Sequence, residues 1–528
     1  MKLSPRITDS VVPVTIAIVA FALYAFFPWA TSRDTMLRFN SPDETANYLF
    51  SERLATGMGL SIPEPLLERS GGVLHPRSTV AVQATIAPAS FIGLPVFYGV
   101  IGFVLGIGIL PYLTPVVASL ALVALWGIWR RLFGERLATL ATVLTAIHPA
   151  YWYYASRGFY HNVLFLALVI FSAWSFFRFR ETRYSVEWLV VCIFFLVGAL
   201  FVRTVEVLWL LPLLLWVLWK EREHLRITHG IIAGAVLGAF LSLALLGFAV
   251  VYSAPLPTGY HQAAAAVASS ASGAFITAAR SILLPLGFDA GRIIANIFNN
   301  GFLLFLPLWL FVAIGFRAMR LHVPRFYMVA IGWVGAWLLV YYGSWFINDS
   351  VGFQTVTVST SFSRYWLPLY VITMPLVAFG VTSLGKQLGR LQLVAALGCL
   401  ALFTFSFSLV YFDPIEGFTA VAGRLQTYRA LSREVNQLTT STAVIVSDRS
   451  DKVFFPDRRV ISPGSLPFSM YPEVLTGIGA VADVVPVYVY VPHEVDADTV
   501  ARLRERQIVL QPPVALMNGG WLYPLLRL

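Results

Sequence analysis

Cysteine and charged residues are both scarce in this sequence. It has two cysteines in 528 residues, and Asp, Glu, Lys and Arg together make up 12%. Cys192 and Cys399 each lie in an apolar run, so the sequence offers neither a disulfide framework nor a Cys-x-x-Cys zinc site. Soluble globular chains average about 25% charged residues, which excludes a water-soluble enzyme. Disorder is excluded as well, because it requires high charge and few apolar residues.

Long apolar runs are abundant instead, since hydrophobic residues make up 58% of the chain. A membrane-spanning helix needs about 20 apolar residues. The first run, Val11–Ala30, is longer than the apolar region of a cleavable signal peptide, so we expect it to remain as the first span. The sequence predicts an all-α polytopic membrane protein with about eleven transmembrane helices. The later spans are expected near 111–129, 137–153, 161–177, 186–202, 204–219, 229–252, 301–317, 326–343, 365–384 and 392–411.

Basic residues orient these spans. Five basic clusters lie in short turns that are two spans apart, so they share one side, and short basic loops mark the cytoplasm. Lys2 and Arg6 place the N-terminus there too. The chain must then cross an even number of times before Arg130, which makes 79–109 a broken or interfacial segment; counting it as a span is the less favoured alternative. Anionic lipid headgroups account for the net charge of +10, and no nucleic-acid partner is expected.

This topology places every long connecting segment on the extracytoplasmic side. These segments are the first outer loop, 31–110, the loops near 253–300 and 344–364, and the tail. The tail alternates a helical pattern at Phe418–Leu438, strand patterns near 443–447 and 485–491, and a short amphipathic pattern at Asp496–Gln507. We therefore predict a transmembrane domain over 1–411 and a small extracytoplasmic α/β domain over 412–528.

The first outer loop opens on a helix start signal that contains two carboxylates. Ser41 suits the N-cap, Pro42 the first helical position and Glu44 the capping-box position. One interpretation is purely structural, because Asp43 and Glu44 complement the dipole of this helix. The other is functional: a carboxylate that stays ionised at the outer membrane surface can accept a proton from a hydroxyl nucleophile. The two interpretations are compatible.

Five short motifs lie along the chain in a fixed order. They are Pro42-Asp43-Glu44 with Tyr48, Arg53-Leu54-Ala55-Thr56-Gly57, His75-Pro76-Arg77, Arg130-Arg131-Leu132-Phe133-Gly134 and Arg364-Tyr365-Trp366-Leu367-Pro368. Together they resemble the GT-C glycosyltransferases, in particular the group of protein O-mannosyltransferases and lipid A aminoarabinose transferases. The usual Pro-Pro pair of that group is absent near His75. By layout the resemblance covers most of the membrane region, but by residues it covers only these short patches.

The resemblance implies transfer of a sugar from a polyprenyl-phosphate carrier to a protein, lipid or glycan acceptor on the outer face, with inversion. Asp43 is then the expected general base, and Glu44 is the second candidate or its positioning partner. The lipid phosphate needs cationic partners as charge grows on it. The expected donor-phosphate residues are Arg364, Tyr365, Arg203 and Arg157, and the expected acceptor or loop-positioning residues are His75, Arg77 and His161.

Structural alternatives apply to each of these residues. Arg364 beside Tyr365 also fits a snorkelling arginine in an aromatic belt, and Arg157, Arg203 and His161 also fit ordinary turn residues. We expect no cofactor and no metal, because no spacing offers several converging oxygen ligands. The alternative functions are a transporter or flippase for a lipid-linked substrate, and a non-catalytic scaffold. The plasma membrane is the expected location. The sequence leaves open the sugar, the acceptor, the carrier length, the oligomeric state and the role of the tail.

Overall fold

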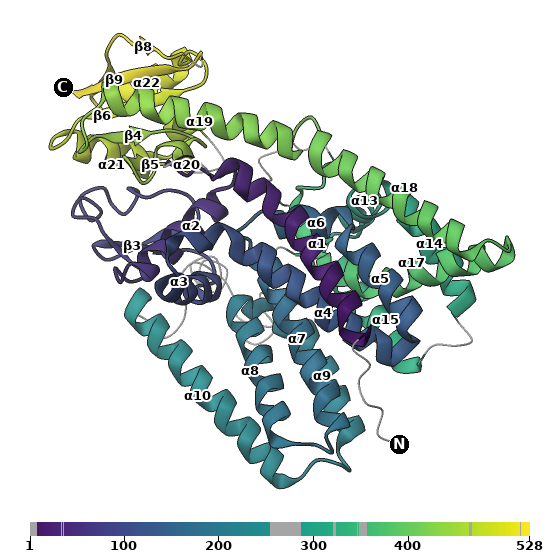
Figure 1. Cartoon of the computed structure of the whole chain (residues 1–528). Helices are drawn as coiled ribbons and strands as arrows, with labels where there is room; N and C mark the ends of the chain where they lie inside the picture. Colours follow the sequence, from purple (N-terminus) through teal and green to yellow (C-terminus); the bar gives the residue numbers. More distant parts are fainter. Residues whose placement is uncertain are drawn as a thin grey trace. The chain divides into compact units, whose positions relative to one another are not determined.

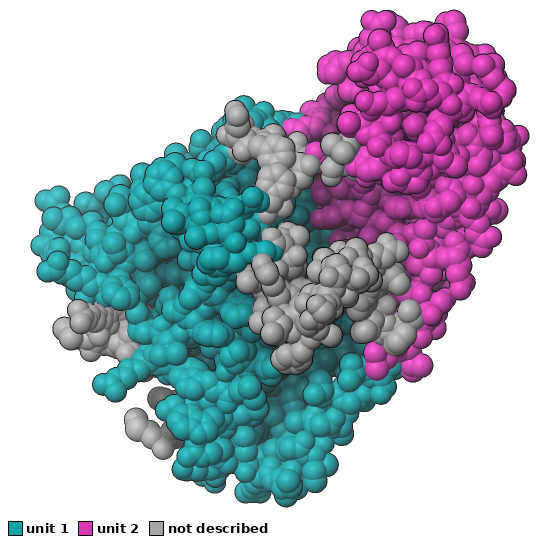
Figure 2. All heavy atoms as spheres, turned by 180° about the vertical axis from the view of Figure 1, so that it is seen from behind, with its two compact units in different colours: residues 1–30, 111–244, 263–420 teal, residues 31–110, 245–262, 421–528 magenta. Residues whose placement is uncertain are grey.

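The computed structural model describes residues 8–528, except 33, 35, 254–286, 320–323, 346, 348–355, 464–466 and 518. Most of the predicted outer loop near 253–300 and part of the one near 344–364 therefore lie outside the described residues. By compactness the chain forms two units, which Figure 2 shows in teal and magenta. Unit 1 comprises 1–30, 111–244 and 263–420, and unit 2 comprises 31–110, 245–262 and 421–528.

Helices dominate the first four fifths of the chain (Figure 1), and many of them are apolar. Within the described residues, six helices are long and apolar enough to cross a membrane. Two bent helix pairs raise the possible number of spans to eight. The integral membrane character is thus supported, whereas the count of eleven spans stays a prediction. The six helices are α1 (Thr8–Thr31), α4 (Leu113–Phe133) with the 3-10 turn η1 (Ile107–Tyr112), α7 (His161–Glu181), α10 (Ile227–Tyr252), α17 (Leu367–Gln387) and α18 (Leu391–Phe412).

Several other helices are short because the chain bends between them. The bend between α8 and the η2–α9 pair measures 119°, and the bend between the α13–η3 pair and α14 measures 92°. The predicted span 137–153 is broken as well. His148 has an extended backbone there because Pro149 follows it. The shorter helices of this region are α5 (Glu135–Ala146), α6 (Pro149–Ser156), α8 (Val186–Val202), η2 (Thr204–Glu206), α9 (Val207–Glu221), α13 (Ala290–Asn296), η3 (Ile297–Leu303), α14 (Leu306–Met319), α15 (Arg325–Tyr341) and α16 (Ser361–Tyr365).

The first outer loop is folded within unit 2. The predicted helix is present as α2 (Pro42–Ala55), and it packs on α3 (Gly93–Leu105). Gly99 permits this approach, because a Cβ there would lie 2.7 Å from the Cβ of Leu54. A small antiparallel sheet in the order β1-β3-β2 lies between these helices in sequence. The segment 79–109 is therefore a hairpin followed by α3. The strands are β1 (Ile62–Pro63), β2 (Thr79–Val82) and β3 (Thr85–Pro88).

The C-terminal part of unit 2 is an α/β fold, as the sequence pattern predicts. Strands β5, β4 and β6 are parallel, and β9 and β7 continue the sheet antiparallel in the order β5-β4-β6-β9-β7, with β8 paired to β9. The elements are α19 (Phe418–Leu438), β4 (Val444–Val446), α20 (Asp451–Phe454), β5 (Arg459–Ile461), η4 (Phe468–Met470), α21 (Pro472–Ala482), β6 (Val487–Val491), α22 (Ala497–Glu505), β7 (Ile508–Leu510), β8 (Val514–Ala515) and β9 (Trp521–Arg527).

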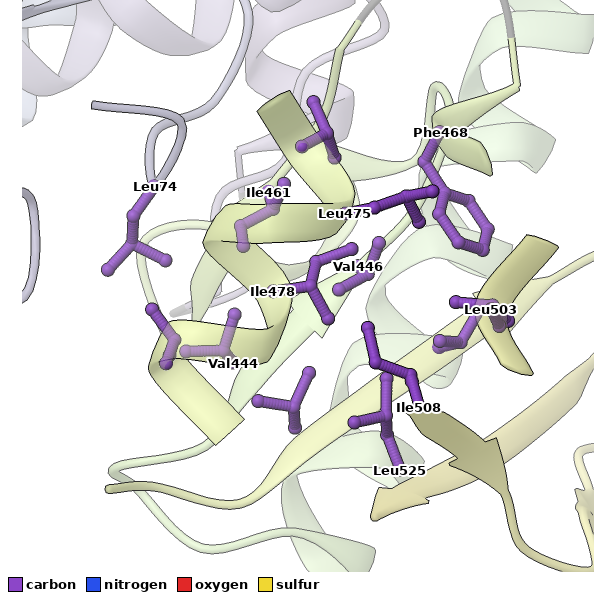
Figure 3. Close-up of a cluster of buried hydrophobic side chains, with 14 of the residues drawn as sticks. Leu74, Val444, Val446, Ile461, Phe468, Leu475, Ile478, Leu503, Ile508 and Leu525 are labelled. Carbon is purple, nitrogen blue, oxygen red and sulfur yellow. The ribbon is translucent and has the colours of Figure 1, made fainter. Parts of the chain in front are cut away.

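The two faces of this sheet are buried by different helices. Side chains alternate along a strand, so Val444 and Val446 of β4 point into one apolar cluster and Ile445 into the other. The first cluster is shown in Figure 3 and contains Ile478 of α21 and Leu503 of α22. The second contains Leu431 and Val435 of α19 and Val453 of α20. The sheet is therefore an interior layer, which explains its β-branched composition.

Candidate active site

Three buried or half-buried arginines of unit 1 are joined through two tyrosine rings. Arg364 lies over both rings, with its Cζ 4.9 Å from the centroid of Tyr160 and 5.3 Å from that of Tyr365. Arg157 Cζ lies 5.6 Å from the ring centroid of Tyr160, and Arg203 Cζ lies 5.1 Å from that of Tyr365. The structure thus brings together the four residues that the sequence assigned to donor phosphate. We call this group the arginine–tyrosine cluster.

Helix ends position the cluster. Arg157 follows the last residue of α6, and Arg203 lies in the sharp bend between α8 and η2. Cations are stabilised at helix C-termini, where the partial charge of the helix dipole is negative. Tyr160 precedes α7, and Arg364 and Tyr365 form the last turn of α16. Residues that are far apart in sequence therefore meet because several membrane helices end at the same place in unit 1.

Arg203 is held by a buried carboxylate. Glu206, which is 3% exposed, accepts hydrogen bonds from Arg203 Nε at 2.8 Å and from the Tyr342 hydroxyl at 2.5 Å, both on Oε1. Its Oε2 accepts from Trp209 Nε1 at 2.5 Å. Tyr342 stacks on Tyr365 with ring centroids 4.5 Å apart. Glu206 thereby orients the Arg203 guanidinium directly. It also holds Tyr342, which stacks on the Tyr365 ring over which that guanidinium lies.

Arg157 and Arg364 are held in a similar way. Arg157 is 2% exposed, and its Nη1 donates to the Tyr153 hydroxyl at 2.6 Å and lies 4.0 Å from Glu416 Oε2. Arg364 donates from Nη2 to the Ser361 hydroxyl at 3.0 Å. Such charge-assisted contacts keep guanidinium groups in one orientation, which matters because their planar donors bind phosphate bidentately. Glu206 pairs with the Arg203 guanidinium, and Glu416 lies beside that of Arg157.

Asp43 and Glu44 form a separate group in unit 2, at the start of α2. The predicted capping box is present: the Asp43 backbone N–H donates to the Ser41 hydroxyl, and Glu44 Oε2 accepts from the Ser41 N–H at 3.2 Å. Glu44 is 2% exposed, whereas Asp43 is half-buried. Asp43 Oδ1 accepts a hydrogen bond of 2.6 Å from the Ser78 hydroxyl. The two adjacent carboxylates therefore make different contacts. That of Glu44 caps the start of α2, and that of Asp43 accepts from Ser78.

His75 and Arg77 lie in the segment that carries Ser78. The His75 ring nitrogen Nδ1 is 2.9 Å from the Pro76 carbonyl oxygen, and burial lowers the pKa of His75 below its usual range, against the raising effects of that contact and of Asp451. Arg77 donates from Nη2 to Asp451 Oδ1 at 2.6 Å, and its backbone N–H donates to Oδ2 at 2.8 Å. His75 thus contacts its own segment and Arg77 is joined to Asp451, while the roles expected for the two residues stay predictions.

The remaining candidates are placed as follows. His161 is the first residue of α7 and is 6% exposed, next to Tyr160 of the arginine–tyrosine cluster. The candidate residues therefore form two groups, one in each unit. Within the ranges that the structure describes, no group of three or more His, Cys, Asp or Glu side chains is arranged to hold a metal ion.

Sequence reasoning missed the groups that orient the candidates. Tyr160, Tyr342 and Ser78 carry no motif of their own, although Ser78 directly follows His75-Pro76-Arg77 and Tyr160 directly precedes His161. Glu206 does have a signal in the sequence, because it lies near the start of the predicted span 204–219 and ionisable residues in spans point to function. Its pairing with Arg203 three residues earlier was also visible as a spacing that joins residues on one helical face.

The comparisons with known proteins agree with this architecture. The family model of the dolichyl-phosphate-mannose-protein mannosyltransferases matches residues 96–249. No curated protein sequence matches the chain. ArnT from Cupriavidus metallidurans bound to undecaprenyl phosphate is similar in structure, with a TM-score of 0.57 and 12% identity over 97% of both chains.

A second solved structure shows the same likeness. The oligosaccharyltransferase of Archaeoglobus fulgidus, in a complex with Zn and sulfate, has a TM-score of 0.54 and 12% identity over 90% of this chain and 67% of its own. The same enzyme tethered to an acceptor peptide containing the NVT sequon has a TM-score of 0.57 at 11% identity. At such identities the likeness establishes the fold. This chain therefore has the GT-C membrane glycosyltransferase fold and resembles the O-mannosyltransferases and ArnT.

Proposed function

We propose that this protein is a membrane glycosyltransferase that moves a sugar from a polyprenyl-phosphate carrier to an acceptor on the extracytoplasmic face. The observation that carries the proposal is the arginine–tyrosine cluster. Arg157, Arg203 and Arg364 come from three parts of the chain and meet on two tyrosine rings. Burying several cations close together costs free energy unless each is paired with an anion, and the buried carboxylates Glu206 and Glu416 lie beside Arg203 and Arg157. A lipid-linked phosphate is an anion that planar guanidinium groups can bind through paired hydrogen bonds.

The cluster supplies what the departing phosphate needs. When the bond between the anomeric carbon and the phosphate oxygen breaks, its electron pair moves onto that oxygen and negative charge grows on the carrier. Donors that are already oriented stabilise this charge without reorganising. Glu206 and Tyr153 hold Arg203 and Arg157 by hydrogen bonds of 2.8 and 2.6 Å. Arg364 completes the set as the arginine that contacts both rings.

Asp43 is the proposed general base. Its carboxylate accepts the proton of the acceptor hydroxyl or amine while the acceptor oxygen or nitrogen attacks the anomeric carbon opposite the phosphate, so the sugar is transferred with inversion. We prefer Asp43 to Glu44 because Glu44 is buried and its carboxylate caps the backbone of Ser41. Glu44 then positions α2. The acceptor is a protein, a lipid or a cell-envelope glycan, and the donor is a hexosyl or pentosyl polyprenyl phosphate.

The proposal includes the predicted location. The protein is expected in the plasma membrane with its N-terminus in the cytoplasm, and Asp43 and the C-terminal domain on the extracytoplasmic side. His161, which adjoins Tyr160, is expected near the donor or acceptor. Residues His75 and Arg77 are expected to act on the loop that carries Ser78 rather than on substrate, because Arg77 is engaged by Asp451.

The test is turnover of a panel of polyprenyl-phosphate sugars by the full-length protein in lipid nanodiscs. Wild type is compared with Asp43→Asn and with a matched control, Asp34→Asn, which alters a carboxylate of the same loop that pairs with Arg433. We expect turnover by wild type and by the control, and its loss in Asp43→Asn. Turnover retained by Asp43→Asn would leave Asp43 as a helix-capping residue only.

The same panel, combined with a transport assay, distinguishes the glycosyltransferase from the transporter alternative. If no donor is turned over with cell-envelope extract as acceptor, yet a donor crosses the bilayer of proteoliposomes, the protein is a flippase. Transporters typically carry ionisable residues within their spans. Glu206, the ionisable residue near a span start, is satisfied by Arg203, Tyr342 and Trp209.

A further inference from the structure

The first outer loop contributes to the core of the C-terminal α/β fold. Leu67, Leu74 and Ile86 are at most 3% exposed and belong to the cluster on one face of the sheet. Figure 3 shows Leu74, on its own ribbon, at the side of the cluster that contains Ile461 and Ile478. Leu49 of α2 belongs to the cluster on the other face. Burying each such side chain contributes about 1.5–3 kcal/mol, so the loop is part of this fold.

Three consecutive residues of α20 bind the loop through polar groups. The Asp451 carboxylate accepts from the backbone N–H and the guanidinium of Arg77. The Lys452 ammonium donates to the backbone carbonyl of Asn40, and the Val453 carbonyl accepts from Arg38 Nε at 2.8 Å. We call Asp451, Lys452 and Val453 the anchoring segment. Its side chains are at most 7% exposed, so solvent screens these contacts little.

The anchored residues flank Asp43. Asn40 lies three residues before Asp43, at the entry to α2, and its side-chain oxygen also accepts from Arg424 Nη1 at 3.0 Å. On the other side, Arg77 is followed by Ser78, whose hydroxyl donates to Asp43 Oδ1 at 2.6 Å. Ser78 has a φ of +61°, in the left-handed region that L-residues with a Cβ rarely adopt. The anchored Arg77 thus holds Ser78 in an unfavourable conformation that aims its hydroxyl at Asp43.

Arg77 of the first outer loop binds at the carboxyl end of strand β4. From β4 the chain crosses to β5 on one side and later to β6 on the other, with all three strands parallel. In such sheets ligands bind outside the carboxyl ends of the strands, at the point where the connections diverge. Here Arg77 donates to the Arg449 carbonyl at 2.7 Å and to Asp451, both just after β4. A residue of the same chain occupies that place.

We propose that the C-terminal domain is a positioning domain for Asp43. The anchoring segment fixes the chain on both sides of the carboxylate, and the Ser78 hydroxyl fixes its direction. This inference rests on the proposed function of Asp43. Ser78, Asp451 and Lys452 are positioning residues and do not touch substrate. Because a displacement of about 1 Å in a reacting group lowers the rate by roughly 100-fold, loss of this support lowers kcat and leaves donor binding by the arginine–tyrosine cluster unchanged.

The kinetic test separates the hydroxyl from the backbone. Ser78→Gly removes the hydroxyl but tolerates a positive φ, whereas Ser78→Asn keeps a donor and also tolerates it. Thr85→Ala is the matched control, because the Thr85 hydroxyl donates to Val82 in the same loop. We expect kcat to fall by about tenfold or more in Ser78→Gly, with KM for the donor unchanged, and to recover in Ser78→Asn. Wild-type kcat in Ser78→Gly would overturn the role of Ser78.

A second test does not depend on turnover. In the full-length protein, Arg77→Met with Asp451→Asn removes both charges of the buried pair, so neither is left without its partner. We expect faster hydrogen–deuterium exchange at the backbone amides of residues 43–47, with unchanged exchange in β6. Exchange equal to wild type in both segments would overturn the anchoring. If wild type turned over no donor, the proposed function would fail, and the exchange measurement would still judge the anchoring.

Discussion

The buried pair of Arg203 and Glu206 gives a prediction in which stability and donor binding respond differently. Glu206 accepts three hydrogen bonds of 2.5–2.8 Å, from Arg203, Tyr342 and Trp209. The side chains of Arg203 and Glu206 are 8% and 4% exposed. Glu206→Leu removes the carboxylate and leaves the Arg203 guanidinium buried without this partner. Breaking a buried ion pair from one side costs about 3–5 kcal/mol.

The double variant Arg203→Met with Glu206→Leu tests the origin of that cost. Replacing both charges by apolar side chains of similar volume is about neutral for stability. We therefore expect Glu206→Leu to have the lowest thermal unfolding midpoint of the three proteins. The double variant is expected to lie above it but below wild type, because the Tyr342 hydroxyl and the Trp209 N–H still lose the Glu206 acceptor. The assay is thermal unfolding of the three proteins, purified in the same detergent and at the same lipid content.

Donor affinity is expected to rank these variants in a different order from their thermal stability. A hydrogen bond to a charged group contributes about 1.5–3 kcal/mol, so the double variant is expected to bind a polyprenyl-phosphate sugar roughly 10- to 150-fold more weakly than wild type. Titration of the donor in nanodiscs measures this. A Glu206→Leu protein as stable as wild type would refute the buried pair, and a double variant that bound donor with wild-type affinity would refute the role of Arg203.

Three further predictions follow from single contacts. Arg364→Lys keeps a charge but loses the planar contact with Tyr160 and Tyr365; we expect KM for the donor to rise about tenfold, and an unchanged KM would argue that Arg364 is only an interfacial residue. Gly99→Ala places a Cβ 2.7 Å from that of Leu54; a cost of about 1–3 kcal/mol to unfolding is expected, and no loss would show that α2 and α3 separate easily. Burial lowers the pKa of His75, so the unfolded chain binds the extra proton. The stability that neutral His75 contributes is therefore complete above pH ~6.5 and is lost as pH falls below it, with a slope of at most about 1.4 kcal/mol per pH unit. Unfolding measured from pH 7.5 to 5 should show a smaller slope in His75→Asn, and equal slopes would exclude His75 as the source.

Local patterns of the sequence predicted local structure well. The helix at Phe418–Leu438 is α19, and the strand patterns near 443–447 and 485–491 contain β4 and β6. The capping box at Ser41 is formed as its residue types require. In each of these cases the determining interactions lie within one turn or one strand, so a single stretch of sequence carries the whole signal.

Long-range arrangements were not predictable in the same way. Arg77 and Asp451 are 374 positions apart, and Arg203 and Tyr342 are 139 apart, so no spacing rule joins them. The apolar pattern at 137–153 suggested one span, yet Pro149 breaks the helix. A run of apolar residues responds to the membrane as solvent, whereas a proline acts on one backbone position, and here the local constraint decided the structure.

The folding of the first outer loop with the C-terminal sheet changes how a deletion of that domain is to be understood. Ion pairs join the loop to the domain at Arg38 with Asp457, Glu64 with Arg459, and Arg77 with Asp451. Without residues 412–528, the loop would expose the apolar side chains that it buries in the sheet and would lose the contacts that orient Asp43. An inactive deletion variant would therefore be expected even if the domain never touched an acceptor. Substitutions at Ser78 and in the anchoring segment, which leave the domain in place, separate positioning from acceptor binding.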